Sequence, residues 1–119
     1  MAPSIILRAE QIAVLLAGVG LWLANGGPPL LLIPALLAPD LSMIGYLRGP
    51  RLGSITYNAI HNLVLGLALI GIGWWSGIGW LLLAGAAVTA HVGSDRALGY
   101  GLKLPTDFRD THLGRIGGR

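Results

Sequence analysis

Four long apolar segments, separated by short turns, make up most of this sequence of 119 residues. They cover approximately residues 9–25, 28–47, 52–75 and 77–102. A helix needs roughly 20 mostly apolar residues, within a range of about 17 to 25, to cross the hydrocarbon core of a bilayer. The alternation of apolar and polar residues that marks membrane strands is missing from these segments. The sequence therefore predicts an all-α integral membrane protein, a four-helix bundle with antiparallel neighbours.

The composition excludes several classes of protein. Hydrophobic residues make up 54% of the chain, charged residues make up 11%, and the mean hydropathy is +0.71, which is too apolar for a soluble domain of this length. Because the chain has no cysteine, disulfides and thiolate metal sites are excluded, and any metal would bind oxygen and nitrogen. Its basic residues are scattered, so we expect no nucleic-acid partner and predict contact with anionic lipid headgroups of the bilayer.

The basic residues predict the orientation of the chain. With four spans, the N-terminus, the turn at residues 48–51 and the C-terminal tail share one side of the membrane, and all 8 Lys and Arg residues fall there. Since Lys and Arg favour the cytoplasmic side, we expect both termini in the cytoplasm, in a bacterial inner membrane. Residues 1–104 would form the transmembrane domain and residues 105–119 a short cytoplasmic tail. Lys103 would extend toward the headgroups.

Tryptophan marks the opposite membrane interface. Trp74, Trp75 and Trp80 lie near the turn between the third and fourth segments, and Trp22 lies near the end of the first. Tryptophan is enriched where membrane proteins cross from lipid into water. We therefore expect the four residues to form an aromatic belt with an anchoring role.

Ionisable side chains gather in the cytoplasmic halves of all four segments. Glu10 opens the first segment, Asp40 lies late in the second and His61 lies early in the third. His91 and Asp95 lie late in the fourth, four residues apart, and so share one helix face. Because a charge at the bilayer centre costs about 2.5 to 3.5 kcal/mol by insertion scales, we expect these groups to face the bundle interior and meet in one pocket.

Two carboxylates and two imidazoles form a ligand set that suits zinc, manganese or iron. The predicted ligands of a divalent metal are Asp40, His61, His91 and Asp95. An open coordination position would allow metal-assisted hydrolysis, with Glu10 as the general base or as an outer partner of a ligand histidine. Arg96 would either neutralise Asp95 or bind an anionic group of the substrate.

Two other functions fit the same residues. The polar side chains would fix helix register by pairing with one another, in a small accessory subunit that packs against a larger membrane complex or against itself. A homo-oligomer whose interface completes the site is a variant of this alternative. Chains of Asp, Glu and His also relay protons, but polar residues are scarce in the other half of the bundle, so a continuous path is not expected.

The chain contains the blocks LAPDLSMIGYLRGPRLGSITYNAIHN and AHVGSDRALGYGLKLPTDFRDTHLGRIG. Together they resemble a bacterial family of small integral-membrane proteins that carries only a domain-of-unknown-function label, and the resemblance covers nearly the whole chain. It implies a membrane location and no particular activity.

Three motifs follow one another along the chain. They are PD at residues 39–40, a histidine at His61, and H-x-x-x-D from His91 to Asp95. Their order and spacing are similar to those of the predicted membrane-bound metal-dependent hydrolases of the bacterial inner membrane. In that family His61 corresponds to the second histidine of an H-x-x-x-x-H pair, and Tyr57 or a neighbour stands where the first would be. The resemblance implies metal-dependent hydrolysis of an amphiphilic substrate, with one ligand of the family pattern missing.

Overall fold

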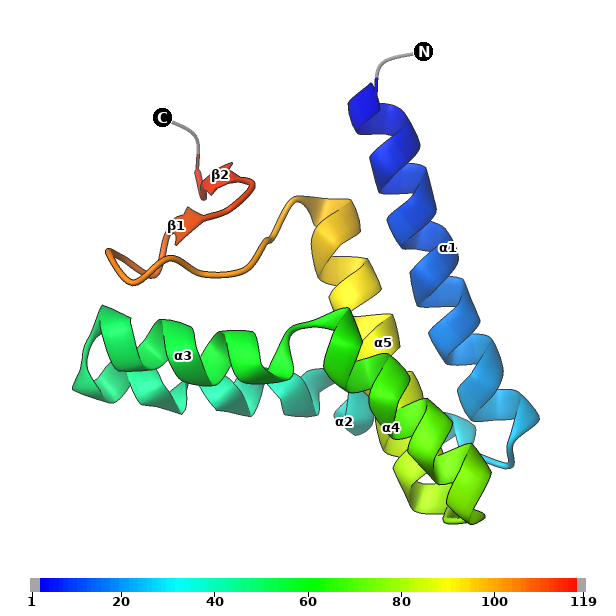
Figure 1. The fold of residues 1–119 in the computed structure, drawn as a ribbon. Helices are drawn as coiled ribbons and strands as arrows, with labels where there is room; N and C mark the ends of the chain where they lie inside the picture. Colours follow the sequence, from blue (N-terminus) through cyan, green and yellow to red (C-terminus); the bar gives the residue numbers. More distant parts are fainter. Residues whose placement is uncertain (1–2, 118–119) are drawn as a thin grey trace.

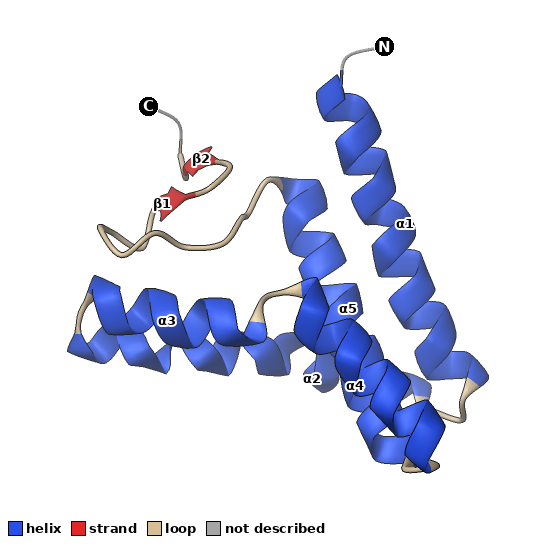
Figure 2. Cartoon of the chain, viewed as in Figure 1, coloured by secondary structure: helices blue, strands red, loops and turns tan. Residues whose placement is uncertain are grey.

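The computed structural model describes residues 3–117, which are mostly helical (Figures 1 and 2). The elements are α1 (Pro3–Ala24), α2 (Pro29–Leu37), the 3₁₀ helix η1 (Ala38–Arg48), α3 (Pro50–Ile60), α4 (Leu63–Ser76), α5 (Gly79–Leu98), β1 (Asp110–Thr111) and β2 (Gly114–Arg115). Because α2 continues into η1 and only a short break separates α3 from α4, the helices form four segments. A mostly helical fold of four segments is thereby confirmed.

Three of these segments are long and apolar enough to cross a membrane, namely Ser4–Ala24, Pro29–Arg48 and Pro50–Ser76. The predicted fourth span, α5, is less apolar because its last turns carry ionisable residues. It is also the central helix, since it packs against both α1 and α4 and most of its residues from Leu82 to Gly93 are buried. A helix surrounded by protein tolerates polar residues that a lipid-facing helix would not.

Glycines bring α1 and α4 into close contact with α5. A side chain at Gly93 would lie 2.6 Å from the amide nitrogen of Leu15 in α1. A side chain at Gly85 would lie 2.6 Å from the amide nitrogen of Ile70 in α4. Small residues at such positions let transmembrane helices approach backbone to backbone. These contacts hold α5 between its two neighbours and fix the depth of its polar end.

The second and third segments bend away from α5. In Figure 1, η1 and α3 lie side by side as a hairpin that runs across the direction of α5. The hairpin turns at Gly49, whose φ of 110° is a conformation that favours glycine. Helix α3 ends at Ile60, and α4 begins at Leu63, after the N-cap residue Asn62, whose side chain accepts a 2.8 Å hydrogen bond from the amide of Leu65. Only the α2 and α4 halves of these segments therefore belong to the bundle around α5.

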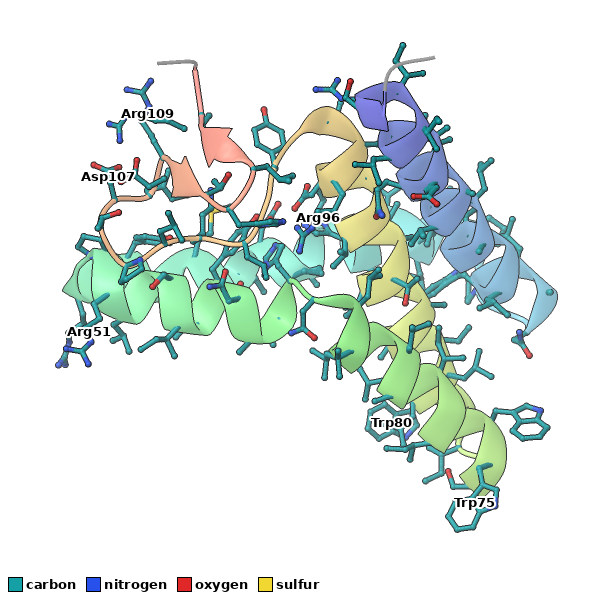
Figure 3. The ribbon with its side chains drawn as sticks, turned by 45° about the horizontal axis from the view of Figure 1, so that its top comes forward. Arg51, Trp75, Trp80, Arg96, Asp107 and Arg109 are labelled. Atoms are coloured by element: carbon teal, nitrogen blue, oxygen red, sulfur yellow. The ribbon has the colours of Figure 1, made fainter. Side chains whose placement is uncertain are left out.

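The tryptophans separate into two groups. Trp75 and Trp80 lie where α4 meets α5, and they are 84% and 70% exposed (Figure 3). In the same view Arg51, Arg96 and Arg109 lie away from that end of the molecule. Trp22 is only 7% exposed, and its Nε1 donates to the carbonyl of Pro28 at 2.9 Å. Its predicted place in the aromatic belt is wrong, because it packs in the core.

The C-terminal tail folds back over the η1–α3 hairpin (Figure 2). The side chain of Asn58 in α3 clamps the backbone of Lys103 by accepting from its amide at 2.6 Å and donating to its carbonyl at 2.8 Å. Further along, the ring of Phe108 meets that of Tyr46 edge to face at a centroid distance of 5.1 Å. An ion pair between Asp110 and Arg115 then closes the small β hairpin. As far as Gly117, the tail is thus a packed part of the fold.

Candidate functional site

The four predicted ligands converge on one point between η1, the α3–α4 break and α5. His61 Nε2 lies 3.1 Å from Asp40 Oδ1 and 3.1 Å from His91 Nε2. His91 Nε2 lies 3.2 Å from Asp40 Oδ1 and 3.1 Å from Asp95 Oδ2. The four candidate ligand atoms all lie within 4.8 Å of one another. This group, called the Asp/His cluster below, is compatible with metal binding.

The spacing can be compared with a tetrahedral metal site. Zinc bonds to nitrogen and oxygen measure about 2.0–2.1 Å, which places tetrahedral ligand atoms roughly 3.3 Å apart. Four of the contacts in the Asp/His cluster measure 3.1–3.2 Å, and His61 Nε2 to Asp95 Oδ2 is longer at 3.9 Å. Four of the six pairs of ligand atoms therefore have nearly the separation that a tetrahedral ion would require, whereas His61 Nε2 and Asp95 Oδ2 lie farther apart.

Both histidines turn their second ring nitrogen toward a backbone carbonyl. His61 Nδ1 lies 2.9 Å from the carbonyl oxygen of Tyr57, and His91 Nδ1 lies 2.5 Å from that of Leu36. Because a carbonyl oxygen only accepts hydrogen bonds, each Nδ1 carries the hydrogen. Each Nε2 of the neutral rings then presents a lone pair to the cluster. Two lone pairs and two carboxylates face one another, which is an arrangement that favours a cation.

The Leu36 carbonyl is available to His91 because of a proline. The chain changes from an α-helix to a 3₁₀ helix after Leu37, and in a 3₁₀ helix the carbonyl of Leu36 would bond to the amide of residue 39. That residue is Pro39, which has no amide hydrogen. The PD motif thus supplies the Asp40 carboxylate, and its proline cannot compete with His91 for the Leu36 carbonyl.

His61 is positioned by the break between α3 and α4. Its φ of −100° and ψ of 49° end α3, and the carbonyl of Tyr57 accepts from both its amide and its Nδ1 at 2.9 Å. The Tyr57 ring stacks on the His61 ring, and its hydroxyl donates to Asp95 Oδ2 at 3.3 Å. Arg96 Nη2 donates to the carbonyl of His61 at 3.1 Å. Tyr57 therefore contacts two members of the cluster directly, and Arg96 holds the backbone of His61.

Glu10 and Arg96 lie outside the Asp/His cluster. Helix α1 turns Gln11 and Leu15 toward Gly93, and this leaves Glu10 exposed on another face. Arg96 donates to the backbone carbonyls of His61 and Tyr100 at 3.1 Å each. The structure thus brings the four candidate ligands together and leaves Glu10 apart.

Two residues near the cluster were not identified from the sequence. Ser42 Oγ lies 3.3 Å from His61 Nδ1. Lys103 is only 4% exposed, with its Nζ 3.9 Å from the Phe108 ring centroid and 4.9 Å from that of Tyr57. Burial lowers the pKa of Lys103, although Asp95 and Asp40 act in the opposite direction. The predicted extension of Lys103 toward the headgroups is wrong, because the tail covers its side chain. No sequence motif marks Ser42 or Lys103.

A polar cavity of about 320 Å³ opens onto the cluster. Its walls include both carboxylates, Asp40 and Asp95, together with Tyr57, Lys103 and the ring of Phe108 from the tail. The Asp40 side chain is 41% exposed and that of Asp95 is 15% exposed, whereas those of His61 and His91 are buried. A small polar molecule would therefore reach the cluster from the carboxylate side.

Comparison with known proteins gives one match. A family model described as "Domain of unknown function (DUF4260)" matches residues 4–116. No curated protein and no solved structure matches the chain. The matched range includes every residue of the Asp/His cluster and most of the tail.

Proposed function

We propose that this chain, which belongs to the DUF4260 family of unknown function, is a membrane-bound, metal-dependent hydrolase of an amphiphilic substrate. The ligands would be Asp40, His61, His91 and Asp95, the ion would be zinc, manganese or iron, and a further coordination position would be open to the substrate. We place the protein in a bacterial inner membrane with both termini in the cytoplasm. The distribution of Lys and Arg along the sequence supports this orientation.

One contact carries the proposal, the 3.1 Å separation between His61 Nε2 and His91 Nε2. If both rings are neutral, neither Nε2 has a hydrogen to share, because both hydrogens are held at Nδ1 by carbonyl groups. If both rings are protonated, two positively charged donors face each other at this distance. A cation between the two nitrogens and the two carboxylates satisfies all four groups at once.

The residues around the polar cavity suggest how the reaction would proceed. A divalent cation at the cluster supplies Lewis-acid chemistry to a substrate carbonyl or phosphoryl group. Asp40 is the cluster residue most open to the cavity, so while its Oδ1 would bind the ion, its other carboxylate oxygen, Oδ2, would take the proton of the attacking water. Lys103 lines the same cavity and would stabilise the negative charge that develops on the substrate. Asp40 takes the role predicted for Glu10, which lies exposed on α1.

A structural role is the second candidate. One proton shared between the two Nε2 atoms would also satisfy them, and the cluster would then only fix helix register. The outward side of the η1–α3 hairpin supports this candidate. On that side Leu41, Ile44 and Leu47 are 77%, 70% and 85% exposed. An exposed apolar surface of this kind suits contact with lipid, with a larger membrane complex or with a second copy of the chain.

Elemental analysis tests the two candidates. The protein would be purified in detergent without chelator, and its metal content measured before and after dialysis against zinc. We expect one divalent ion per chain in the wild type, loss of the ion in His91→Ala, and retention in His112→Ala, a histidine of the tail outside the cluster. Hydrolysis of a panel of acyl esters and phosphoesters should stop with chelator and return with zinc. A wild type that stays metal-free after dialysis would establish the structural candidate.

A further inference from the structure

We infer that an apolar cavity beside the Asp/His cluster binds the acyl chain of a bilayer amphiphile and brings the polar end of that molecule to the cluster. This inference rests on the proposed function, because it names the substrate class of the same site. The cavity has a volume of about 440 Å³, which lies within the range of about 300–1,000 Å³ that is usual for ligand sites. All its lining side chains are apolar, and they come from α1, α2, η1, α3 and α5.

The apolar cavity and the cluster share one face of α5. The residues of α5 that line the cavity recur at helical spacing and are Trp80, Leu83, Ala84, Ala87 and Val88. His91 follows Val88 by three residues and Asp95 follows His91 by four, so both lie on the same stripe of the helix. The stripe runs about 12 Å from Trp80 to Val88 at about 1.5 Å per residue. An elongated apolar space thus ends where the polar residues begin.

The other walls meet the cluster in the same way. Pro39 lines the cavity and directly precedes Asp40, and Ile60 lines it and directly precedes His61. The elements that supply the ligands therefore also supply the end of the cavity. A molecule that fills the space places one end against the cluster, and its polar group would lie toward the polar cavity that Lys103 lines.

The surroundings of the cavity indicate its occupant. Small side chains, those of Ala35, Ala38, Ala84 and Ala87, form much of its wall and leave room for a chain of methylene width. Its walls lie in or beside segments that are apolar enough to cross a membrane, where acyl chains are the abundant apolar molecules. Since no lining side chain offers a hydrogen bond into the space except the indole of Trp80, a sugar or nucleotide would lose its hydration there without replacement. An acyl chain has no hydrogen bonds to water that it could lose.

Trp22 provides a probe inside the cavity. It lines the space but is 7% exposed, so a quencher in the surrounding lipid has little contact with it. Replacing Trp74, Trp75 and Trp80 by Phe leaves Trp22 as the single tryptophan. This variant would be placed in phosphatidylcholine vesicles that contain increasing fractions of a fatty acid brominated in mid-chain. We expect quenching of Trp22 that saturates at a few mole per cent of the brominated fatty acid.

Two matched substitutions complete the test. Ala84→Phe fills the cavity and should remove the saturable quenching, whereas Ala68→Phe, on the exposed face of α4, should keep it. Ala38→Phe, at the exposed rim of the cavity, serves the same purpose if Ala84→Phe does not fold. Quenching that rises in proportion to the brominated fraction, equally in all variants, would show ordinary lipid contact and overturn the inference.

Metal content measured on the same samples separates the two proposals. Bound metal without saturable quenching overturns only the acyl-chain site, and saturable quenching without metal overturns the proposed hydrolase.

Discussion

Tyr57 and His61 are joined through both backbone and side chain. The carbonyl of Tyr57 accepts from the His61 amide and from its Nδ1, each at 2.9 Å, and the two rings stack with centroids 3.6 Å apart and planes 6° apart. Tyr57 also donates its hydroxyl to Asp95 Oδ2 at 3.3 Å. One residue thus orients two members of the cluster from different elements.

Tyr57→Phe removes only the hydroxyl contact with Asp95 and keeps the stacking and the carbonyl. Outer partners of this kind typically contribute about 10–100-fold to metal affinity, so we expect a loss in that range. Competition with a chromogenic chelator would measure it. Tyr100→Phe, which also removes a hydroxyl at the polar cavity but leaves the Asp95 contact intact, is the control. Equal affinities for the two variants would contradict the role given to the Tyr57 hydroxyl.

Pro39→Ala tests the orientation of His91 without changing a ligand. The new amide hydrogen at residue 39 would compete with His91 Nδ1 for the Leu36 carbonyl. We expect weaker metal binding with helical content unchanged, measured by metal titration and circular dichroism. Pro34→Ala, inside α2, makes the same chemical change away from the cluster and should bind metal as the wild type does. If Pro39→Ala also binds normally, the proline does not act through this carbonyl.

Lys103 should lose its proton at lower pH than a free lysine. Burial disfavours its charged form and lowers its pKa below the ordinary value of about 10.4. Between the lowered pKa and the ordinary one, the unfolded chain binds more protons than the folded chain, so the free energy of unfolding should rise with pH in that window. Because Lys103 is the only lysine, reductive ¹³C-methylation gives a single lysine signal for NMR titration. A midpoint at or above the ordinary value would contradict the prediction.

Gly85→Ala should destabilise the packing of α4 on α5. The added carbon would lie 2.6 Å from the Ile70 amide and 2.7 Å from the Gly66 carbonyl, both backbone atoms that cannot move aside independently. Overpacking of this kind costs about 1–3 kcal/mol. Gly71→Ala, in α4, meets no atom within 4 Å and is the matched control, expected to be as stable as the wild type. Denaturation in mild detergent, followed by circular dichroism, would compare the two.

The proposed orientation can be tested because the chain has no cysteine. Single cysteines would be introduced by Ser76→Cys, at the α4–α5 turn, and by Leu104→Cys, in the tail. Both positions are exposed. We expect a membrane-impermeant maleimide to label Ser76→Cys in intact cells and Leu104→Cys only after permeabilisation. The reverse pattern would place the termini outside the cytoplasm.

The sequence was sufficient to predict the helical segments and the meeting of their polar residues. Apolar length fixed the segments, and helical spacing placed His91 and Asp95 on one face. The crosswise hairpin was not predictable, because its two arms, residues 38–48 and 50–60, belong to two segments that are each apolar and long enough for a span, Pro29–Arg48 and Pro50–Ser76. Its geometry depends on tertiary pairing of η1 with α3 and on the break at His61, which propensity does not reveal.

Details of the site depended on contacts between distant parts of the chain. Tyr57 was four residues from His61 and therefore on the same face, but its bond to Asp95 spans 38 positions. The burial of Lys103 requires the tail to fold over the hairpin, and the tail carries no pattern strong enough to predict that contact. Glu10 shared the depth of the cluster but not its face, because the packing of Gly93 against α1 sets the rotation of that helix.

The break at His61 would also change how much of a bilayer its segment can cross. The segment Pro50–Ser76 has 27 residues, so a straight helix would measure about 40 Å, against a hydrocarbon core of about 30 Å. Straightening it would withdraw the His61 imidazole from its neighbours. A metal held by the Asp/His cluster would therefore stabilise the bent form by linkage, and a thicker membrane, which favours a longer span, would weaken its binding. Under the proposed function, hydrophobic mismatch would thus change metal affinity through a single histidine.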